Sequence, residues 1–113
     1  DKNNITHYIT EGMIRASQRK LSQPHWKNFN LPYHSQASTD KIKLQPNTIT
    51  KIKFYLYPTA RTLKKGDKIR LAIMNADMNN TETVHHKDKV IMHLYHGKKT
   101  PSTLLLPCKK MRP

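Results

Sequence analysis

Apolar and polar residues alternate in several short segments of this chain. Between residues 50 and 57, Ile52, Phe54 and Leu56 share one face of an extended strand, and lysines and tyrosines occupy the other face. The segment 68–73 repeats this alternation. Five further segments are short and strand-like, namely 5–10, 13–19, 41–44, 89–95 and 103–106. Since no segment carries an apolar stripe at the helical period of about 3.6 residues, the pattern predicts an all-β sandwich or barrel with little helix.

Residues that favour turns separate the predicted strands. Gly12 is expected to allow a positive φ between the first two strands, because glycine lacks a Cβ atom. Asn47 is one of the few other residue types that accept left-handed geometry. Gly66 supplies the turn before the strand at 68–73. These positions predict where the chain reverses direction.

Residues 21–40 are predicted to form a long irregular loop, because they contain two prolines and many small polar residues and show no periodicity. Trp26, Phe29 and Tyr33 follow one another in this loop at spacings of three and four residues. They would form either an aromatic binding ledge or a small cluster that pins the loop onto the sandwich. We favour the pinning cluster.

The chain of 113 residues is about the size of one domain, so residues 1–113 are expected to form a single domain or a domain fragment. No run of about 18 apolar residues is present, and we therefore expect no membrane span. Cys108 is the one cysteine, which excludes an internal disulfide and leaves the cellular compartment open. The chain begins at Asp1 without an initiator methionine or a signal sequence, and we expect it to be processed or cut from a longer protein.

Lysine and arginine number 21 against 7 acidic residues, which gives a formal net charge of +14. The basic residues are scattered as singles and pairs, so we interpret them as an evenly basic surface and expect no nucleic-acid partner. The alternative is a free-standing basic module that binds nucleic acid or an anionic glycan. It would use the loop aromatics with Lys41, Lys43, Lys51 and Lys53, the last two sharing a strand face with Tyr55 and Tyr57.

No catalytic motif is present in the sequence. The G-x-S-x-G elbow of α/β-hydrolases is absent, and the three glycines, Gly12, Gly66 and Gly97, are too scattered for a phosphate-binding loop. Asp67 and Asp77 are expected to be turn residues rather than paired catalytic carboxylates. We therefore predict no catalytic residue and no cofactor-binding residue.

The histidines and the cysteine give only weak indications of chemistry. His93 and His96 would point to opposite faces of one strand, and together with the pair His85-His86 they are interpreted as structural rather than as metal ligands. Cys108 has no neighbouring base. The glycosylation sequons at Asn4 and Asn79 are interpreted as chance matches. No metal site is predicted.

Five short motifs in order resemble the C-terminal β-domain of the cocaine esterase and X-prolyl dipeptidyl-peptidase family of serine hydrolases. That family shows a Gly-x-Leu-Arg-Ala-Ser-x-Arg-like strand, a Leu-x-Pro-Gly turn, a strand ending in Pro-Thr, a Gly-His-Arg-Leu-Arg-Leu strand and a final Pro-Ser-x-Leu-x-Leu-Pro. The matching segments are 12–19, 44–47, 56–59, 66–71 and 101–107. Asn47 and Asp67 stand where the family usually has Gly and His.

The resemblance implies a jelly-roll-like β-sandwich, similar to galactose-binding domains, that packs on an α/β-hydrolase domain and shapes substrate access or assembly. It also implies that the sandwich is incomplete at its N-terminal side, because the family has further strands before the first motif. The family's catalytic Ser, Asp and His belong to the α/β domain, so the chain alone is expected to be no enzyme, and its parent protein a serine hydrolase acting on ester or peptide bonds. An open strand edge would favour a homo-oligomer. Carbohydrate binding would rest on the fold alone.

Overall fold

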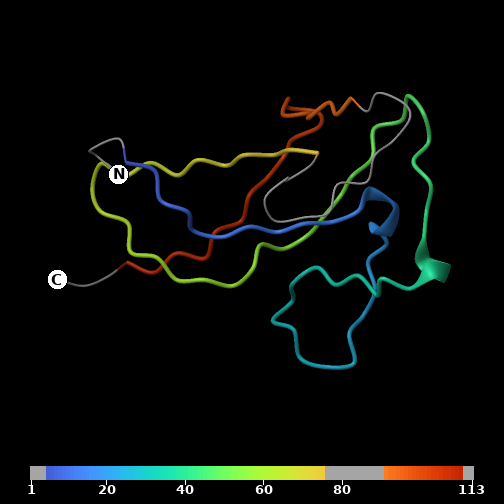
Figure 1. Ribbon diagram of the computed structural model, residues 1–113, viewed down its shortest axis with the longest axis horizontal. Helices are drawn as coiled ribbons and strands as arrows, with labels where there is room; N and C mark the ends of the chain where they lie inside the picture. The colour runs from blue at the N-terminus through green and yellow to red at the C-terminus, as the bar shows by residue number, and fades with distance from the viewer. Residues whose placement is uncertain (1–4, 76–90, 111–113) are drawn as a thin grey trace. The chain divides into compact units, whose positions relative to one another are not determined.

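The computed structural model describes residues 5–75 and 91–110 (Figure 1). Its elements are two 3-10 helices, η1 (Ala16–Gln18) and η2 (Ser38–Asp40). The remaining described residues are extended segments, bends and turns, and no strand is assigned among them. The chain divides into two units, residues 1–69 and 70–113, and each unit is described by itself.

In the first unit, the segment at residues 10–12 lies beside the segment at 55–57 in antiparallel order. The backbone N–H of Tyr57 donates to the carbonyl of Glu11 at 2.8 Å, and the Thr10 hydroxyl donates to the carbonyl of Tyr57 at 2.7 Å. A β-ladder repeats backbone bonds at alternate residues, whereas here a single backbone bond is supplemented by a side chain. The predicted strands therefore lie extended and adjacent at this point without forming a regular ladder.

Gly12 has a different role from the one predicted. Among the described glycines, Gly66 has a positive φ, whereas Gly12 does not, so the expected positive φ at Gly12 is wrong. A Cβ atom at Gly12 would collide with the carbonyl oxygen of Tyr55 and lie 3.1 Å from the Cα of Leu56. Glycine is required at this position because two backbones approach each other closely.

The segment 13–19, predicted as one strand, instead ends in η1. The backbone N–H of Gln18 donates to the carbonyl of Arg15 at 2.8 Å, which is the i to i+3 bond of a 3-10 turn. Immediately beside this turn, the N–H of Ile42 donates to the carbonyl of Ser17 at 2.8 Å. This hydrogen bond joins the 3-10 turn of η1 to the segment that follows η2.

Arg19 reinforces the contact between these two segments. Its Nη1 donates to the carbonyl of Ile42 at 2.6 Å and to that of Ala16 at 2.9 Å, and its Nη2 donates to the carbonyl of Lys43 at 3.2 Å. One planar guanidinium thus satisfies three backbone acceptors on two segments. The Arg19 guanidinium therefore links η1 to the start of residues 41–44.

The two predicted turns at Asn47 and Gly66 are confirmed. Asn47 has a φ of 57°, and Gly66 has a φ of 96°. In the second turn, the N–H of Asp67 donates to the carbonyl of Lys64 at 3.0 Å, and the Asp67 carboxylate accepts from the N–H of Lys64 at 2.8 Å. Asp67 is therefore a turn residue, as the sequence predicted.

The second unit is described from residue 70 to 75 and from 91 to 110. A turn closes where the N–H of Thr100 donates to the carbonyl of Gly97 at 3.2 Å, and the Ser102 hydroxyl donates to the carbonyl of Tyr95 at 2.5 Å. These bonds fold residues 95–102 back on themselves. The predicted strand at 89–95 begins outside the described residues.

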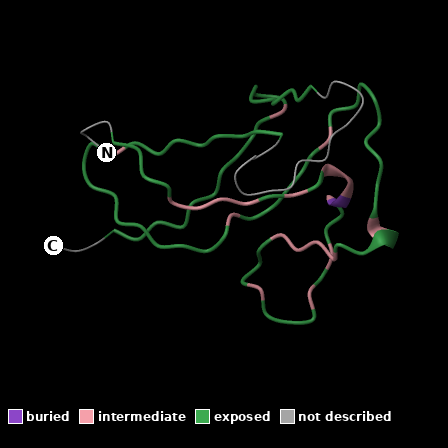
Figure 2. Ribbon diagram, in the orientation of Figure 1, coloured by how far each residue is buried: buried purple, intermediate pink, exposed green. Residues whose placement is uncertain are grey.

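Burial is slight throughout the described part of the chain (Figure 2). Gln18 is the buried residue there, with 6% of its surface exposed, and no hydrophobic side chain in the described ranges is buried. Many of the alternating apolar residues of the predicted strands are exposed, including Ile52, Phe54, Leu71 and Leu104, whereas Leu56 is half-buried. The described residues therefore enclose none of the apolar side chains that the alternating pattern placed on strand faces.

Candidate functional site

The two arms of the loop at residues 21–36 come together at its base, which we call the neck of the loop. In Figure 1 this part of the chain leaves η1 and returns to nearly the point from which it departed. The backbone N–H of Ser22 donates to the carbonyl of Tyr33 at 2.9 Å, which joins the outgoing and returning arms. The excursion predicted from the sequence is thus a closed loop with a fixed base.

Asp40, the last residue of η2, binds side chains from both arms of the loop at this neck. Its carboxylate accepts hydrogen bonds from the Lys20 ammonium at 2.5 Å, the Ser35 hydroxyl at 2.6 Å and the Ser22 hydroxyl at 3.5 Å. The bonds from Lys20 and Ser35 lower the pKa of Asp40, because they stabilise its charged form, and burial opposes them only in part. Asp40 therefore stays a carboxylate across the neutral range and ties both arms of the loop to η2.

His34 makes the third connection at the neck. Its Nδ1 lies 3.0 Å from the carbonyl oxygen of Lys20, and its Nε2 lies 2.8 Å from the carbonyl oxygen of Lys53. The ring therefore bridges the start of the loop and the predicted strand at 50–57. The two partners are 14 and 19 residues away along the chain.

The tip of the loop is a tight turn at residues 28–31. The N–H of Leu31 donates to the carbonyl of Asn28 at 3.1 Å, and the Asn28 amide donates to the carbonyl of Leu31 at 2.7 Å. Phe29 and Asn30 have φ values of 56° and 60°, so both central residues adopt left-handed geometry. This turn carries the Phe29 side chain outward, where 79% of it is exposed.

Aromatic residues from the loop and from 55–58 line an open hollow of about 370 Å³. The rings of Trp26 and Tyr33 meet edge to face, with centroids 5.1 Å apart and planes at 81°. The rings of Tyr55 and Tyr57 do the same at 6.3 Å and 73°. Such pairs favour edge-to-face geometry because the ring edge is positive and the ring face is negative. We call this feature the aromatic hollow.

The aromatic hollow brings together all the loop aromatics singled out from the sequence. Phe29 also lines it, and the Lys27 ammonium lies 5.9 Å from the centre of the Phe29 ring, within the range of a cation–π contact. Trp26 remains 59% exposed. The loop aromatics therefore share one hollow with residues 55–58 and at the same time present an open face.

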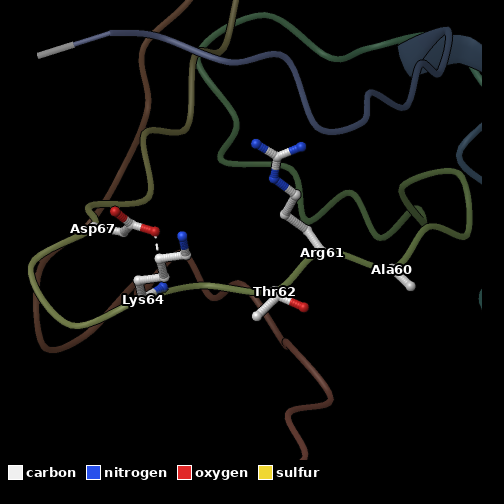
Figure 3. A pocket seen from close by; sticks show the side chains of 5 residues that line it. All are labelled: Ala60, Arg61, Thr62, Lys64 and Asp67. Carbon is white, nitrogen blue, oxygen red and sulfur yellow. Dashed lines mark hydrogen bonds between the residues drawn. The ribbon is translucent and has the colours of Figure 1, made fainter. Parts of the chain in front are cut away.

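A second, polar hollow of about 360 Å³ lies at the turn before Asp67 (Figure 3). Figure 3 shows Arg61 and Thr62 pointing to opposite sides of the extended chain, while Asp67 accepts its bond from Lys64. The carboxylate of Asp67 is thus engaged by its own turn. Nothing in this hollow combines a nucleophile with a base.

The other residues considered from the sequence do not form a site in the described ranges. Cys108 is a free, exposed thiol, and His93 and His96 are exposed. Across residues 5–75 and 91–110, no group of three or more His, Cys, Asp or Glu side chains could hold a metal ion. No helix in these ranges is long and apolar enough to cross a membrane. Other positions named above lie outside the described residues, namely Asn4, Asp77, Asn79, His85 and His86.

Comparison with known proteins identifies the chain at the level of a domain class. Residues 2–105 match the family described as the X-Pro dipeptidyl-peptidase C-terminal non-catalytic domain. The chain belongs to this family, and the resemblance drawn from the five motifs is confirmed. It is therefore a non-catalytic domain, the class that the sequence predicted.

Two mycobacterial relatives add a more particular likeness. Proteins of Mycobacterium bovis and Mycobacterium tuberculosis, each named "Putative serine esterase", are 40% identical to the chain over 75 residues. The match covers 65% of this chain and 12% of each relative, so the chain corresponds to a small part of those proteins. No solved structure matches the chain significantly.

Sequence reasoning missed the residues that organise the loop neck. Asp40, His34 and Arg19 act through partners that lie distant in the sequence, and most of those partners are backbone carbonyls. Any residue supplies a carbonyl, so residue spacing carries no signal for these contacts. The aromatic hollow was predictable only in part: the basic-module alternative used the loop aromatics with lysines on the strand face of Tyr55 and Tyr57, but the sequence did not show that these two sets of aromatic residues line one hollow.

Proposed function

We propose that this chain is the accessory β-domain of a larger serine hydrolase, where it packs on an α/β-hydrolase domain and shapes substrate access or assembly. Family membership supports the non-catalytic role, and the names of the mycobacterial relatives support an ester-cleaving parent protein. X-Pro peptide cleavage is the other activity that the family description offers for the parent. The observation that carries the proposal is the family match over residues 2–105.

Large apolar side chains are exposed along several of the predicted strands. Ile69, Leu71 and Ile73 are each about half exposed, and Leu105 is 85% exposed. Soluble domains rarely leave so many large apolar side chains in water, because each one buried contributes about 1.5–3 kcal/mol. A second domain that covers these faces would supply this stabilisation.

The proposal also specifies the fold. We propose that residues 1–113 form one domain, a jelly-roll-like sandwich that further strands from the parent protein complete at its N-terminal side. The alternating pattern and the family membership support this fold. Solving the structure of the parent protein tests it, and a helical arrangement of residues 50–73 there would contradict it.

The functional proposal is tested by recombining the domain with the rest of its parent protein. The chain alone should hydrolyse neither p-nitrophenyl esters nor X-Pro substrates. The remainder of the parent, produced separately, should regain activity or change its KM when the chain is added. Turnover by the chain alone that a serine-directed inhibitor abolishes would overturn the proposal.

A second candidate function is a basic binding module for nucleic acid or an anionic glycan. The net charge of +14 and the Lys27–Phe29 contact beside the aromatic hollow favour it. Binding to single-stranded DNA, measured over a salt series, separates the two candidates. Micromolar affinity with a steep salt dependence would support the module, because phosphate contacts release counterions, and weak or absent binding would support the accessory domain.

A further inference from the structure

His34 is placed between two hydrogen-bond acceptors. Both of its ring nitrogens face backbone carbonyl oxygens, that of Lys20 at 3.0 Å and that of Lys53 at 2.8 Å. A carbonyl oxygen cannot donate, so each contact needs an N–H on the ring. A neutral imidazole has one N–H, whereas an imidazolium has two. The geometry as it stands is satisfied in full only by protonated His34.

We infer that His34 is a proton-operated clasp, which holds the loop at residues 21–36 against the segment at 50–57 when protonated and releases one side when neutral. On deprotonation, one ring nitrogen presents a lone pair to a carbonyl oxygen. That contact is repulsive, and the ring retains only one of its two bonds. When the bond that is lost is the one to the Lys53 carbonyl, the loop and the segment at 50–57 are no longer joined through this ring.

The clasp controls the aromatic hollow, because it lies at the base of both walls. His34 directly follows Tyr33 on the loop wall, and Lys53 precedes Tyr55 by two residues on the opposite wall. Loss of the contact with the Lys53 carbonyl, which is the one that reaches the opposite wall, frees the two walls to separate. Opening of the aromatic hollow is thus coupled to the charge on a single imidazole.

The other ties at the neck do not respond in the same pH range. Asp40 holds Lys20, Ser22 and Ser35, and the Lys20 and Ser35 bonds keep its pKa below the ordinary value. Histidine is the side chain that ordinarily changes charge between about pH 5 and 8. The Asp40 bonds therefore keep the neck closed while the charge on His34 changes.

The charged groups around His34 bear on the strength of the clasp. Lys20 and Lys53 both carry positive side chains, which oppose a second positive charge nearby. Asp40 neutralises the Lys20 ammonium at 2.5 Å, and the Lys53 side chain is exposed to solvent.

Trp26 provides a direct readout, because it is the single tryptophan of the chain and lines the aromatic hollow. We expect its emission and its accessibility to acrylamide to change in one proton-linked step. Closing the hollow at low pH should shift the opening equilibrium by roughly two- to tenfold, the contribution of one net hydrogen bond. The change should be absent in His34→Gln.

His25→Gln is the matched control. His25 is the loop's other histidine, it adjoins Trp26, and no hydrogen bond to it is found in the described residues. This variant should keep the pH-dependent step, and it removes any direct quenching of Trp26 by a protonated neighbour. A step that persists in His34→Gln and disappears in His25→Gln would overturn the clasp.

Nitrogen NMR of the wild-type chain tests the proton directly and does not depend on whether a variant folds. At low pH, both His34 ring nitrogens should carry protons with slow solvent exchange and show couplings across hydrogen bonds to the two carbonyls. At high pH, one of these couplings should vanish together with the change in Trp26 emission. Retention of both couplings after deprotonation, or their absence at low pH, would refute the inference.

Discussion

Replacing Gly12 by alanine should loosen the contact between residues 10–12 and 55–57. The new Cβ atom would collide with the carbonyl oxygen of Tyr55 and press against the Cα of Leu56. Both neighbours are backbone atoms, so a side-chain rotation cannot relieve the clash. The two segments would have to move apart.

The cost follows from the bonds that this movement strains. Separation weakens the N–H bond from Tyr57 to Glu11 and the hydroxyl bond from Thr10 to Tyr57. Each is worth about 0.5–1.5 kcal/mol net, and alanine offsets about 0.4–1 kcal/mol by restricting the unfolded chain. With overpacking included, we expect Gly12→Ala to lower the free energy of unfolding by about 1–3 kcal/mol.

Gly97→Ala is the matched control for the same substitution. No atom lies within 4 Å of the Cβ position at Gly97, and Gly97 is not among the residues with positive φ. The loss of conformational freedom in the unfolded chain should therefore be the main effect of this substitution, and it should stabilise the variant by about 0.4–1 kcal/mol.

The two variants are compared with wild type by urea unfolding of the full chain, followed through Trp26 fluorescence and circular dichroism. Gly12→Ala should unfold at lower urea than wild type, and Gly97→Ala at equal or higher urea, with unchanged slopes. If Gly12→Ala were as stable as Gly97→Ala, the close approach of the two backbones would be disproved.

Three other predictions concern residues that tie the first unit together. Arg19→Lys should lower the free energy of unfolding by about 1–2 kcal/mol, because a lysine ammonium cannot reach the backbone carbonyls of both segments as the Arg19 guanidinium does. Equal urea midpoints for the variant and wild type would contradict this. Gly66→Ala should cost about 1–2 kcal/mol in the same assay, since the residue sits at a φ of 96°, and an unchanged midpoint would show that the turn relaxes freely. For Asp40 the lowered pKa means that its stabilising contribution is present above the ordinary aspartate value of about 3.9 and is lost as the pH falls through the lowered pKa. Asp40→Asn should therefore reduce stability at pH 7 and flatten the acid side of the stability profile, and a wild-type acid profile in this variant would assign that dependence to other groups.

The sequence predicted those parts of the structure that depend on local chemistry. Asn47 and Gly66 fall at turns with positive φ, as their residue types require. Gly12 shows the limit of the same reasoning. Glycine serves either a positive φ or a close approach, and only the partner backbone at 55–56, more than forty residues later, decides between them.

The candidate site was predictable to a smaller degree. The spacing of Trp26, Phe29 and Tyr33 indicated an aromatic cluster, and the structure brings these residues to one hollow. The contacts that position the cluster, at His34 and Asp40, depend on how the loop closes. Loop closure depends on the whole fold, so no local sequence pattern predicts it.

The family assignment and the exposure of the apolar residues support the same interpretation by independent routes. The alternation of apolar and polar residues places Ile52 and Phe54 on one strand face, and this face stabilises the fold only if it is covered. In the described residues the face stays exposed, while the family is defined as a C-terminal non-catalytic domain. A free-standing binding module has to cover its own core, whereas a domain of a family that normally packs with a catalytic domain does not. The uncovered face therefore favours the accessory domain over the basic module.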